Sequence, residues 1–319
     1  MKRACKISFK WTLAVGATLA LVWGQATSAS AADELTLDTA QTKAAKDDAP
    51  AEYFLGKRYE HGKGVTQDYA KAADYLRQAA DQGYALAQTD LGALYAQGLG
   101  VKQDDHQAAA WYRKAADNGD PLAQYAMGLF YSEGRGVPSD LQESLKWYKE
   151  AAAHNQPDAL LALGDIYSNG RNGIAINARE AVDWLEKARA QGIYDADNSL
   201  GSIYQYGGGG IDPDPKKAFD YYQEAALKGN GRAEMNLGRL YIDGSGVKVD
   251  LVEAYKWLYL ATRNGEVLAR HYLRELDGTM PNLASPLTAD QKAEAIRQAN
   301  ELQKAIRIRK DNTKVAIKE

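Results

Sequence analysis

The 319-residue sequence contains a single cysteine and only four histidines. Cys5 lies in a short basic stretch at the amino terminus, and no cysteine follows it. This excludes disulfides, thiolate metal sites and cysteine nucleophiles from the rest of the chain. The histidines are far apart in the sequence and none stands in an HExxH-type arrangement, so we predict no catalytic residue, metal or cofactor. They are His61, His106, His154 and His271.

An excess of positive charge and a long apolar run are also missing. The formal net charge is −3, and removal of the first 31 residues lowers Lys plus Arg from 39 to 35 against 42 Asp plus Glu, which gives −7. A mildly acidic chain is a poor match for nucleic acid, because phosphate binding requires clustered Lys and Arg. Since no run of about 20 apolar residues is present, we predict no membrane span in the mature chain.

The first 31 residues form a pattern of their own. A basic head over residues 2–10 precedes an apolar run over residues 11–23, and an Ala-Ser-Ala site follows at residues 29–31. The run is too short for a transmembrane helix, and the three parts together are typical of a secretory signal peptide. We therefore predict cleavage after Ala31 or Ala32 and a periplasmic or secreted mature protein. An uncleaved amino-terminal anchor is the alternative.

The sequence does contain a motif that recurs at a nearly fixed interval. The glycines of its opening dipeptides are separated by 36, 36, 36, 37 and 37 residues. A period between 20 and 50 residues is the signature of a stacked repeat protein, which grows in one direction and has no single central core. The dipeptides are Leu55-Gly56, Leu91-Gly92, Met127-Gly128, Leu163-Gly164, Leu200-Gly201 and Leu237-Gly238.

The first half of each unit predicts a helix that ends at a glycine-rich turn. In the second unit Ala87, Leu91 and Leu94 recur at helical spacing. The paired glycines Gly98 and Gly100 then reverse the chain, because glycine adopts positive φ without steric cost. The glycine of each opening dipeptide lies inside the helix, where it costs about 1 kcal/mol relative to alanine. Its recurrence predicts a close crossing with a neighbouring helix.

The second half of each unit predicts another helix. It begins at an Asp or Asn whose side chain can accept hydrogen bonds from the first turn. An aromatic residue is followed one turn later by two alanines, as in Trp111 with Ala115 and Ala116, so that large and small side chains interdigitate. The predicted helix starts are Asp68, Asp104, Asp140, Asn177, Asp214 and Asp250.

The complete motif resembles the Sel1-like repeat, a relative of the tetratricopeptide repeat. Its parts are the Leu-Gly dipeptide, GxGV, the capping Asp, Trp-Tyr and Ala-Ala, and the resemblance covers six units over residues 51–265 with a partial seventh helix near residues 268–276. It implies an all-α superhelix whose first helices line a concave groove. It also implies a non-enzymatic adaptor or regulator that binds a protein or peptide in the bacterial envelope.

Two other functions stay open under the same resemblance. Cysteine-rich members of the family resemble β-lactamase-like or penicillin-binding proteins, which implies an enzyme acting on cell-wall or β-lactam-like substrates. The absence of cysteine after Cys5 disfavours this reading, so we predict that the protein is not an enzyme. A scaffold that holds several envelope proteins together is the third possibility. Neither the partner nor the oligomeric state follows from the sequence.

The chain divides into five predicted parts. A signal peptide over 1–31 is followed by a polar segment over 32–50, the solenoid over 51–276, a linker and capping helix over 277–308, and a flexible tail over 309–319. Thr288 and Gln291 are spaced as a capping box at the start of the last helix. The polar stretch up to Asp48 and the final residues predict partial disorder.

The candidate binding surface is a stripe on the first helices, at positions two before, two after and five after the dipeptide leucine. By the family resemblance this stripe lines the groove. It is less charged than the chain as a whole and includes apolar and aromatic residues, which are typical of protein contacts. The alternative is that these residues pack against a neighbouring repeat. The predicted residues are Tyr53, Lys57, Thr89, Tyr125, Leu129, Leu161, Asp165, Asn198, Ser202, Met235 and Arg239.

Overall fold

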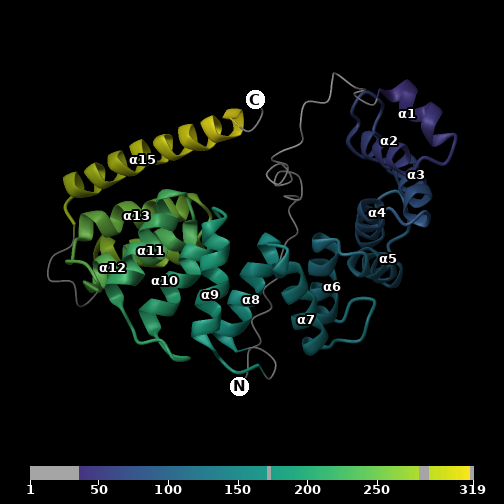
Figure 1. The fold of residues 1–319 in the computed structure, drawn as a ribbon. Coiled ribbons are helices and arrows are strands. Elements are labelled where there is room, and N and C mark those ends of the chain that lie inside the picture. The colour runs from purple at the N-terminus through teal and green to yellow at the C-terminus, as the bar shows by residue number, and fades with distance from the viewer. Residues whose placement is uncertain (1–35, 171–173, 280–286, 317–319) are drawn as a thin grey trace, which may run out of the picture.

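The structure is a computed structural model that describes residues 36–170, 174–279 and 287–316. The predicted signal peptide lies outside the described residues. Within them the chain forms fifteen α-helices and no strand (Figure 1). The helices are α1 (Leu37–Ala44), α2 (Ala49–His61), α3 (Tyr69–Asp81), α4 (Ala85–Gln97), α5 (Asp105–Asp117), α6 (Pro121–Glu133), α7 (Leu141–Ala153), α8 (Pro157–Asn169), α9 (Ala178–Ala190), α10 (Asp195–Tyr206), α11 (Pro215–Leu227), α12 (Gly231–Asp243), α13 (Leu251–Arg263), α14 (Val267–Arg274) and α15 (Ala289–Ala316).

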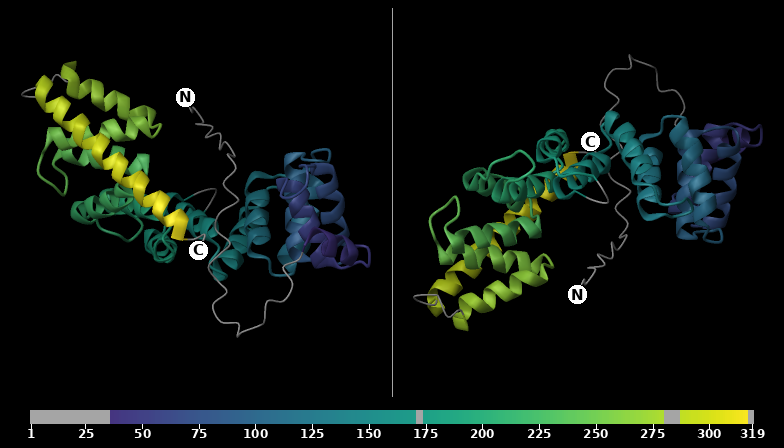
Figure 2. Two further views of the ribbon diagram at one scale, coloured as in Figure 1. Left: turned by 90° about the horizontal axis from the view of Figure 1, so that it is seen from above. Right: turned by 90° about the horizontal axis from the view of Figure 1, so that it is seen from below.

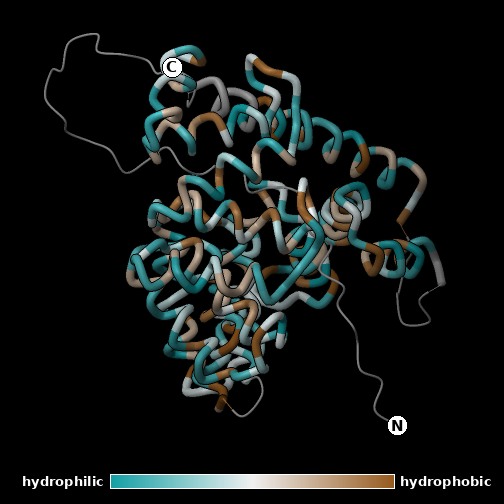
Figure 3. Tube along the Cα trace, turned by 90° about the vertical axis from the view of Figure 1, so that its right-hand side faces the viewer, coloured by the Kyte–Doolittle hydropathy of each residue, from teal (hydrophilic) through white to brown (hydrophobic). Residues whose placement is uncertain are grey.

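The helices α2 to α13 form six consecutive pairs, which confirms the predicted all-α solenoid. The even-numbered helices are the first helices of the repeats and the odd-numbered ones the second helices. The pairs follow one another in a curved row rather than around one centre (Figures 1 and 2). Apolar and polar segments alternate along the trace, as expected where each helix buries one face (Figure 3).

The dipeptide glycines lie at the crossings between the two helices of a repeat. A Cβ atom on Gly128 would lie 2.5 Å from the Tyr148 ring, and one on Gly164 would lie 2.5 Å from Leu185 Cδ2. Only glycine allows α6 and α8 to approach their partner helices this closely. The predicted packing role of these glycines is confirmed.

The second glycine of a turn has a role that the sequence analysis did not predict. Gly136 has φ of +63°, and a Cβ atom there would lie 2.0 Å from the Asp105 carbonyl oxygen at the start of the second helix of the preceding repeat. The same contact recurs between Gly100 and Tyr69 and between Gly246 and Pro215. This glycine therefore permits both the turn and the stacking of one repeat on the next.

The predicted helix starts are confirmed by their capping hydrogen bonds. Asp104 Oδ1 accepts from the backbone N–H groups of His106 at 2.9 Å and Gln107 at 3.1 Å. Three other starts accept two such hydrogen bonds as well, and Asn177 and Asp214 each accept one. Trp111 is buried, as are Ala115 and Ala116 one turn later. These local signals fix where each second helix begins and which face it buries.

The array begins with half a repeat that the sequence analysis missed. Ala40 and Ala44 of α1 are buried against α2, and Asp47 takes the left-handed conformation with φ of +58°. Asp47 lies one 36-residue period before Gly83, which is left-handed as well. The segment before Asp48 was expected to be partly disordered, but it contains the helix α1. This helix is ordered because it packs against α2, the first helix of the first repeat.

The array ends where the dipeptide glycine is lost. The partial seventh helix is α14, followed by a π-helical turn at Glu275–Thr279. Leu273 and Arg274 stand where the other units have leucine and glycine. Arginine at this position prevents a second helix from crossing at the distance seen in the other repeats, so α14 stays without one.

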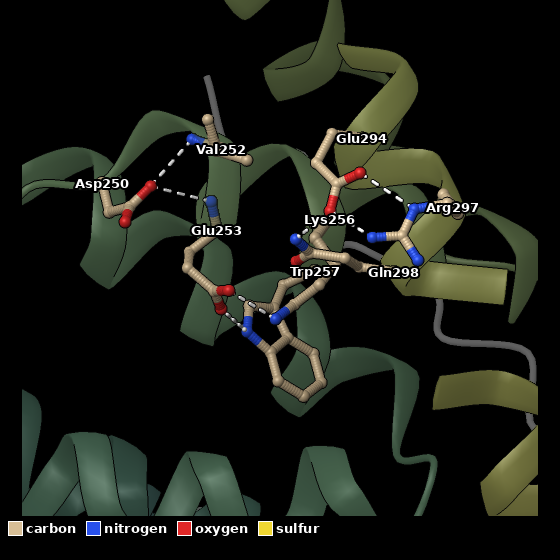
Figure 4. Close-up of polar contacts among 8 residues, drawn as sticks. All are labelled: Asp250, Val252, Glu253, Lys256, Trp257, Glu294, Arg297 and Gln298. Atoms are coloured by element: carbon tan, nitrogen blue, oxygen red, sulfur yellow. Dashed lines mark hydrogen bonds and ion pairs between the residues drawn. The ribbon is translucent and has the colours of Figure 1, made fainter. Parts of the chain in front are cut away.

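The carboxy-terminal helix α15 packs against α13 instead. Ala295 and Ala299 are buried in this contact, and Thr288 and Gln291 form the predicted capping box, with N···O distances of 2.9 and 3.2 Å. Figure 4 shows the polar side chains on both sides of the α13–α15 contact. The helix continues to Ala316 rather than ending near residue 308.

Candidate partner-binding face

The predicted stripe runs along α2, α4, α6, α8, α10 and α12, and we call this surface the first-helix face. Ten of its eleven predicted residues are half-buried. The exception is Thr89, which is 4% exposed. Its hydroxyl donates to the Ala85 carbonyl at 3.2 Å and lies beside Asp120, the cap of α6. The prediction that Thr89 is accessible to a partner is therefore wrong, because the start of the next first helix covers it.

The amino-terminal end of the first-helix face is a charged network. Lys57 Nζ lies 2.6 Å from Glu60 Oε2 and 2.7 Å from Asp90 Oδ2. Both oxygens are closed off from solvent. Tyr53 adds a hydrogen bond to Asp90. Lysine and tyrosine from α2 thus bind a carboxylate from α4 and tie the first two repeats together.

Burial and the neighbouring charges shift the pKa values of the side chains in this network. Desolvation raises the pKa of Asp90, and Lys57 offsets only part of that rise. Burial alone would lower the pKa of Lys57, but Asp90 and Glu60 outweigh it and raise the pKa above its ordinary value. The pKa of Tyr53 rises as well, first through burial and then through Asp90. Lys57 lies between the two carboxylates of Glu60 and Asp90. These three side chains therefore already bind one another.

The middle of the first-helix face is engaged in packing. Tyr125, Leu129 and Leu161 lie against the buried core of the third and fourth repeats, and the Tyr125 ring centroid lies 5.7 Å from that of Tyr148. Asp165 Oδ1 accepts a hydrogen bond of 2.7 Å from Asn169. These apolar side chains therefore pack against the core rather than standing free of it, and the ring contact of Tyr125 lies within its own repeat.

The carboxy-terminal end brings together an amide pair and an arginine. Asn198 Oδ1 accepts from Asn236 Nδ2 at 3.1 Å, which links α10 to α12. Arg239 forms a hydrogen bond with Tyr206, and its guanidinium carbon lies 5.5 Å from the centre of the Tyr272 ring. Ser202 on α10 is half-buried and forms a hydrogen bond with Tyr222. Three successive first helices, α10, α12 and α14, therefore contribute to one surface.

Large exposed residues lie on the two helices α10 and α14 that contact this arginine, and the sequence analysis missed them. Tyr206 is 62% exposed, Leu268 63% and Val267 74%. Tyr206 lies six residues after its dipeptide leucine and Leu268 five before Leu273, positions that share the helix face of the stripe. A search of five positions per helix rather than three would have found both. Met235, by contrast, packs against the core beneath α13 and α14.

No catalytic or metal-binding constellation stands out in the part of the chain that the structure describes. No three His, Cys, Asp or Glu side chains there are grouped so that they could hold a metal. None of the helices in that part is long and apolar enough to cross a membrane. A shallow hollow of about 780 Å³ lies between α7 and the turn before α9, lined by residues that include Lys146, Lys149 and Tyr167. It contains no nucleophile paired with a base.

The Sel1 repeat family model matches six consecutive segments that together make up more than half of the chain: residues 49–84, 85–120, 121–156, 157–193, 195–230 and 231–266. Among solved structures, a protective antigen of uropathogenic Escherichia coli strains with an SLR fold is 32% identical with a TM-score of 0.71, and the match covers 84% of this chain. The chain spans only 56% of that antigen.

A Sel1 repeat protein from Oxalobacter formigenes is similar too. It is 30% identical with a TM-score of 0.66, and the match covers 79% of this chain and 96% of the Oxalobacter protein. No curated protein matches the sequence significantly. Both structural likenesses extend over most of the solenoid, beyond any single repeat.

Proposed function

The chain belongs to the Sel1 repeat family, and from this premise we propose that it is a non-enzymatic adaptor or regulator that binds a protein or peptide partner on the carboxy-terminal end of the first-helix face. Sel1 repeat proteins are generally protein-interaction modules, and their fold is typically a scaffold rather than a catalytic framework. The family supplies the class of function. The side chains on α10, α12 and α14 supply the candidate site.

One observation carries the proposal. Tyr206, Arg239 and Leu268 come from three consecutive first helices and combine an exposed aromatic ring, a cation and an exposed aliphatic side chain. Aromatic residues and arginine dominate the energetics of protein interfaces, and exposed apolar residues that are grouped mark contact sites. In the charged network of Lys57 and in the packed middle of the face, the side chains already have partners within the chain.

We also propose that the partner belongs to the cell envelope and that the protein acts in the periplasm or after secretion. The basic head, the apolar run and the Ala-Ser-Ala site of the first 31 residues support this location. Amino-terminal sequencing of the protein from its source is expected to begin at Ala32 or Asp33. A mature protein that retains Met1 and stays in the cytosol would contradict the location and leave the binding surface to be tested separately.

Affinity capture from cross-linked cells tests the surface. The triple variant Tyr206→Ala, Arg239→Glu, Leu268→Ala is expected to retain at most about a tenth of the specific partner seen with the wild type, because each central interface residue contributes on the order of 2 kcal/mol. Thermal denaturation of the same variant should show a folded protein. A matched control, Lys146→Glu on the exposed side of α7, should capture the partner as the wild type does.

Two results would contradict the proposal. A folded triple variant that captures every partner at wild-type level places binding elsewhere on the array. Equal loss in the Lys146→Glu control indicates a diffuse effect of charge rather than a defined site.

A further inference from the structure

One side of α14, the last first helix of the array, is exposed along the whole helix. Val267, Arg270, His271 and Arg274 follow one another at i, i+3, i+4 and i+7, so they share one helix face, and all four residues are exposed. We call these four residues the α14 stripe. At a rise of 1.5 Å per residue the stripe is about 10 Å long, which suits a few residues of a partner chain.

The stripe belongs to the one first helix that carries a net positive charge. The helix α14 contains Arg270 and Arg274 and no Asp or Glu, a net charge of +2 with histidine neutral. The six first helices before it carry net charges between −2 and 0. An acidic segment is therefore attracted to the end of the array and repelled from its middle, where α8 and α10 carry −2 each.

The carboxylates that flank α14 in the sequence are already paired. Glu266 Oε1 lies 3.9 Å from Arg232 Nε, and Glu275 Oε1 lies 3.1 Å from His271 Nε2. Within the part of the chain that the structure describes, no carboxylate lies within 4.0 Å of the Arg270 guanidinium. The charge of Arg270 is therefore directed to the outside.

Other repeats show what the position of Arg270 contacts where a second helix is present. The equivalent residues of the first and sixth repeats, Glu52 and Glu234, are 1% and 0% exposed. Glu52 accepts from Gln82 Nε2 at 2.6 Å, and Glu234 accepts from Asn264 Nδ2 at 2.8 and 2.9 Å, both at the carboxyl ends of second helices. Arg270 reverses this polarity because a guanidinium only donates. A segment on this side of α14 must supply acceptors, and carboxylates form the strongest hydrogen bonds to arginine.

We propose that the α14 stripe binds an acidic segment of the protein partner, with an aliphatic side chain of that segment packed on Val267. Val267 is 74% exposed and adjoins Leu268, which is 63% exposed. The inference rests on the proposed function, because Leu268 belongs to the partner site and the same partner continues from it along α14. Arg274 prevents a close helix crossing, but carboxylates reach a guanidinium at the tip of its long side chain without one.

Fluorescence anisotropy with synthetic peptides tests the chemical class of the partner. Three labelled peptides of about twelve residues carry leucine at the same positions and have Glu, Gln or Lys, alternating with Ala, at the others. The glutamate peptide is expected to bind the full chain at least about tenfold more tightly than the glutamine peptide, and the lysine peptide most weakly. Raising the salt from about 0.05 to 0.5 M should weaken the glutamate peptide about tenfold, because screening shortens the range of the attraction.

Variants of Arg270 locate the binding on the stripe. Arg270→Glu should weaken the glutamate peptide by about tenfold or more, whereas Arg270→Lys, which keeps the charge, should stay within about threefold of the wild type. The matched control is Lys102→Glu, the same reversal at an exposed lysine in the turn between α4 and α5. It should bind the peptide as the wild type does. Circular dichroism checks that each variant is folded.

Three results would overturn the inference: no binding of the glutamate peptide, equal binding of the three peptides, and equal weakening by Arg270→Glu and Lys102→Glu. Concentration-dependent self-association that Arg270→Glu abolishes would also overturn it and assign the stripe to a second copy of the chain.

Affinity capture separates this inference from the proposed function. If Tyr206→Ala, Arg239→Glu, Leu268→Ala loses the cellular partner and Arg270→Glu retains it fully, the acidic class is rejected and the site on the first-helix face stands. If Arg270→Glu loses the partner and the triple variant retains it, the stripe is supported and the site on the first-helix face is rejected.

Discussion

Lys57 and Arg239 occupy the same position in the first and sixth repeats, two residues after the dipeptide leucine, and each reaches the same position of the following first helix. Lys57 meets Asp90 there at 2.7 Å, whereas Arg239 meets the Tyr272 ring, with its guanidinium carbon 5.5 Å from the ring centre. At the amino-terminal end the cation is neutralised in a buried network. At the carboxy-terminal end it stacks on an aromatic ring beside exposed Tyr206 and Leu268.

The difference shows that one position of the repeat makes different side-chain contacts at the two ends of the array. A desolvated lysine with two carboxylates is costly to break, because the remaining charges are left without a partner. An arginine over a ring contributes about 1 kcal/mol and keeps a charge that a partner can use. We infer that the first repeat uses this position for stability and the sixth uses it for contact.

The comparison assumes that successive repeats stack in the same geometry at both ends of the array. Substitution of the turn glycines tests this assumption and has the largest expected effect on the free energy of unfolding. Gly100→Ala and Gly246→Ala would each place a Cβ atom 2.1 Å from a backbone oxygen of the preceding repeat, at φ of +70° and +73°. Strain and overpacking together should lower the free energy of unfolding by about 3 to 4 kcal/mol at either site. Chemical denaturation measures both.

The matched controls for the turn glycines are Gly83→Ala and Gly265→Ala. These residues have positive φ as well, but a Cβ atom added at either one would have no neighbouring atom within 4 Å, so only the backbone strain of about 1 to 2 kcal/mol should remain. If Gly246→Ala is no worse than Gly265→Ala while Gly100→Ala is severe, the two ends do not share one stacking geometry.

The next largest effect separates the two cations directly. Lys57→Met leaves Glu60 and Asp90 facing each other with no cation and should cost about 2 kcal/mol in the free energy of unfolding, because the network is largely buried. Arg239→Met removes only the contacts to Tyr206 and Tyr272 and should cost less than about 1 kcal/mol. Equal losses in denaturation experiments would contradict the division between stability and contact.

A smaller effect concerns pH. Because burial raises the folded-state pKa of Asp90 above its ordinary value of 3.8, this carboxyl binds a proton more readily in the folded than in the unfolded chain. Stability at this site is therefore gained as the pH falls through the folded-state pKa, and the gain is complete below the ordinary value of 3.8. Lys57→Met removes the cation that offsets part of the rise in the pKa of Asp90, so the variant should regain stability relative to wild type between pH 7 and pH 5.

The double variant Lys57→Met, Asp90→Asn is the control for this titration. It lacks the carboxyl that would take up the proton, so the gain on acidification should disappear. Persistence of the gain in denaturation curves at the two pH values would assign it to Glu60 or to another group.

The smallest expected effect concerns the exposed residues. Tyr206→Ala and Leu268→Ala should each change the free energy of unfolding by less than about 0.5 kcal/mol, since more than half of each side chain is exposed. Tyr125→Ala, at the packed middle of the face, should cost about 2 kcal/mol or more. A melting temperature of Tyr206→Ala as low as that of Tyr125→Ala would show that the carboxy-terminal surface is part of the core.

The sequence by itself determined the repeat, its period and its local parts. Helix periodicity, the Asp and Asn caps and the positive-φ glycines depend on residues within a few positions of one another, so they could be read from a single unit and confirmed in every other. The dipeptide glycines also predicted a close helix crossing. Glycine weakens a helix, so its recurrence in six repeats requires a packing reason.

Only the tertiary structure decided which residues of the first-helix face remain available to a partner. The burial of Thr89 depends on Asp120, and that of Tyr125 on Tyr148, contacts between residues that are more than 20 positions apart and whose side chains had to be placed first. The ends of the array were decided in the same way. Ala40 and Ala44 are recognisable as half a repeat only once they are seen packed against α2, and the exposure of Leu268 is known only from the placement of α14.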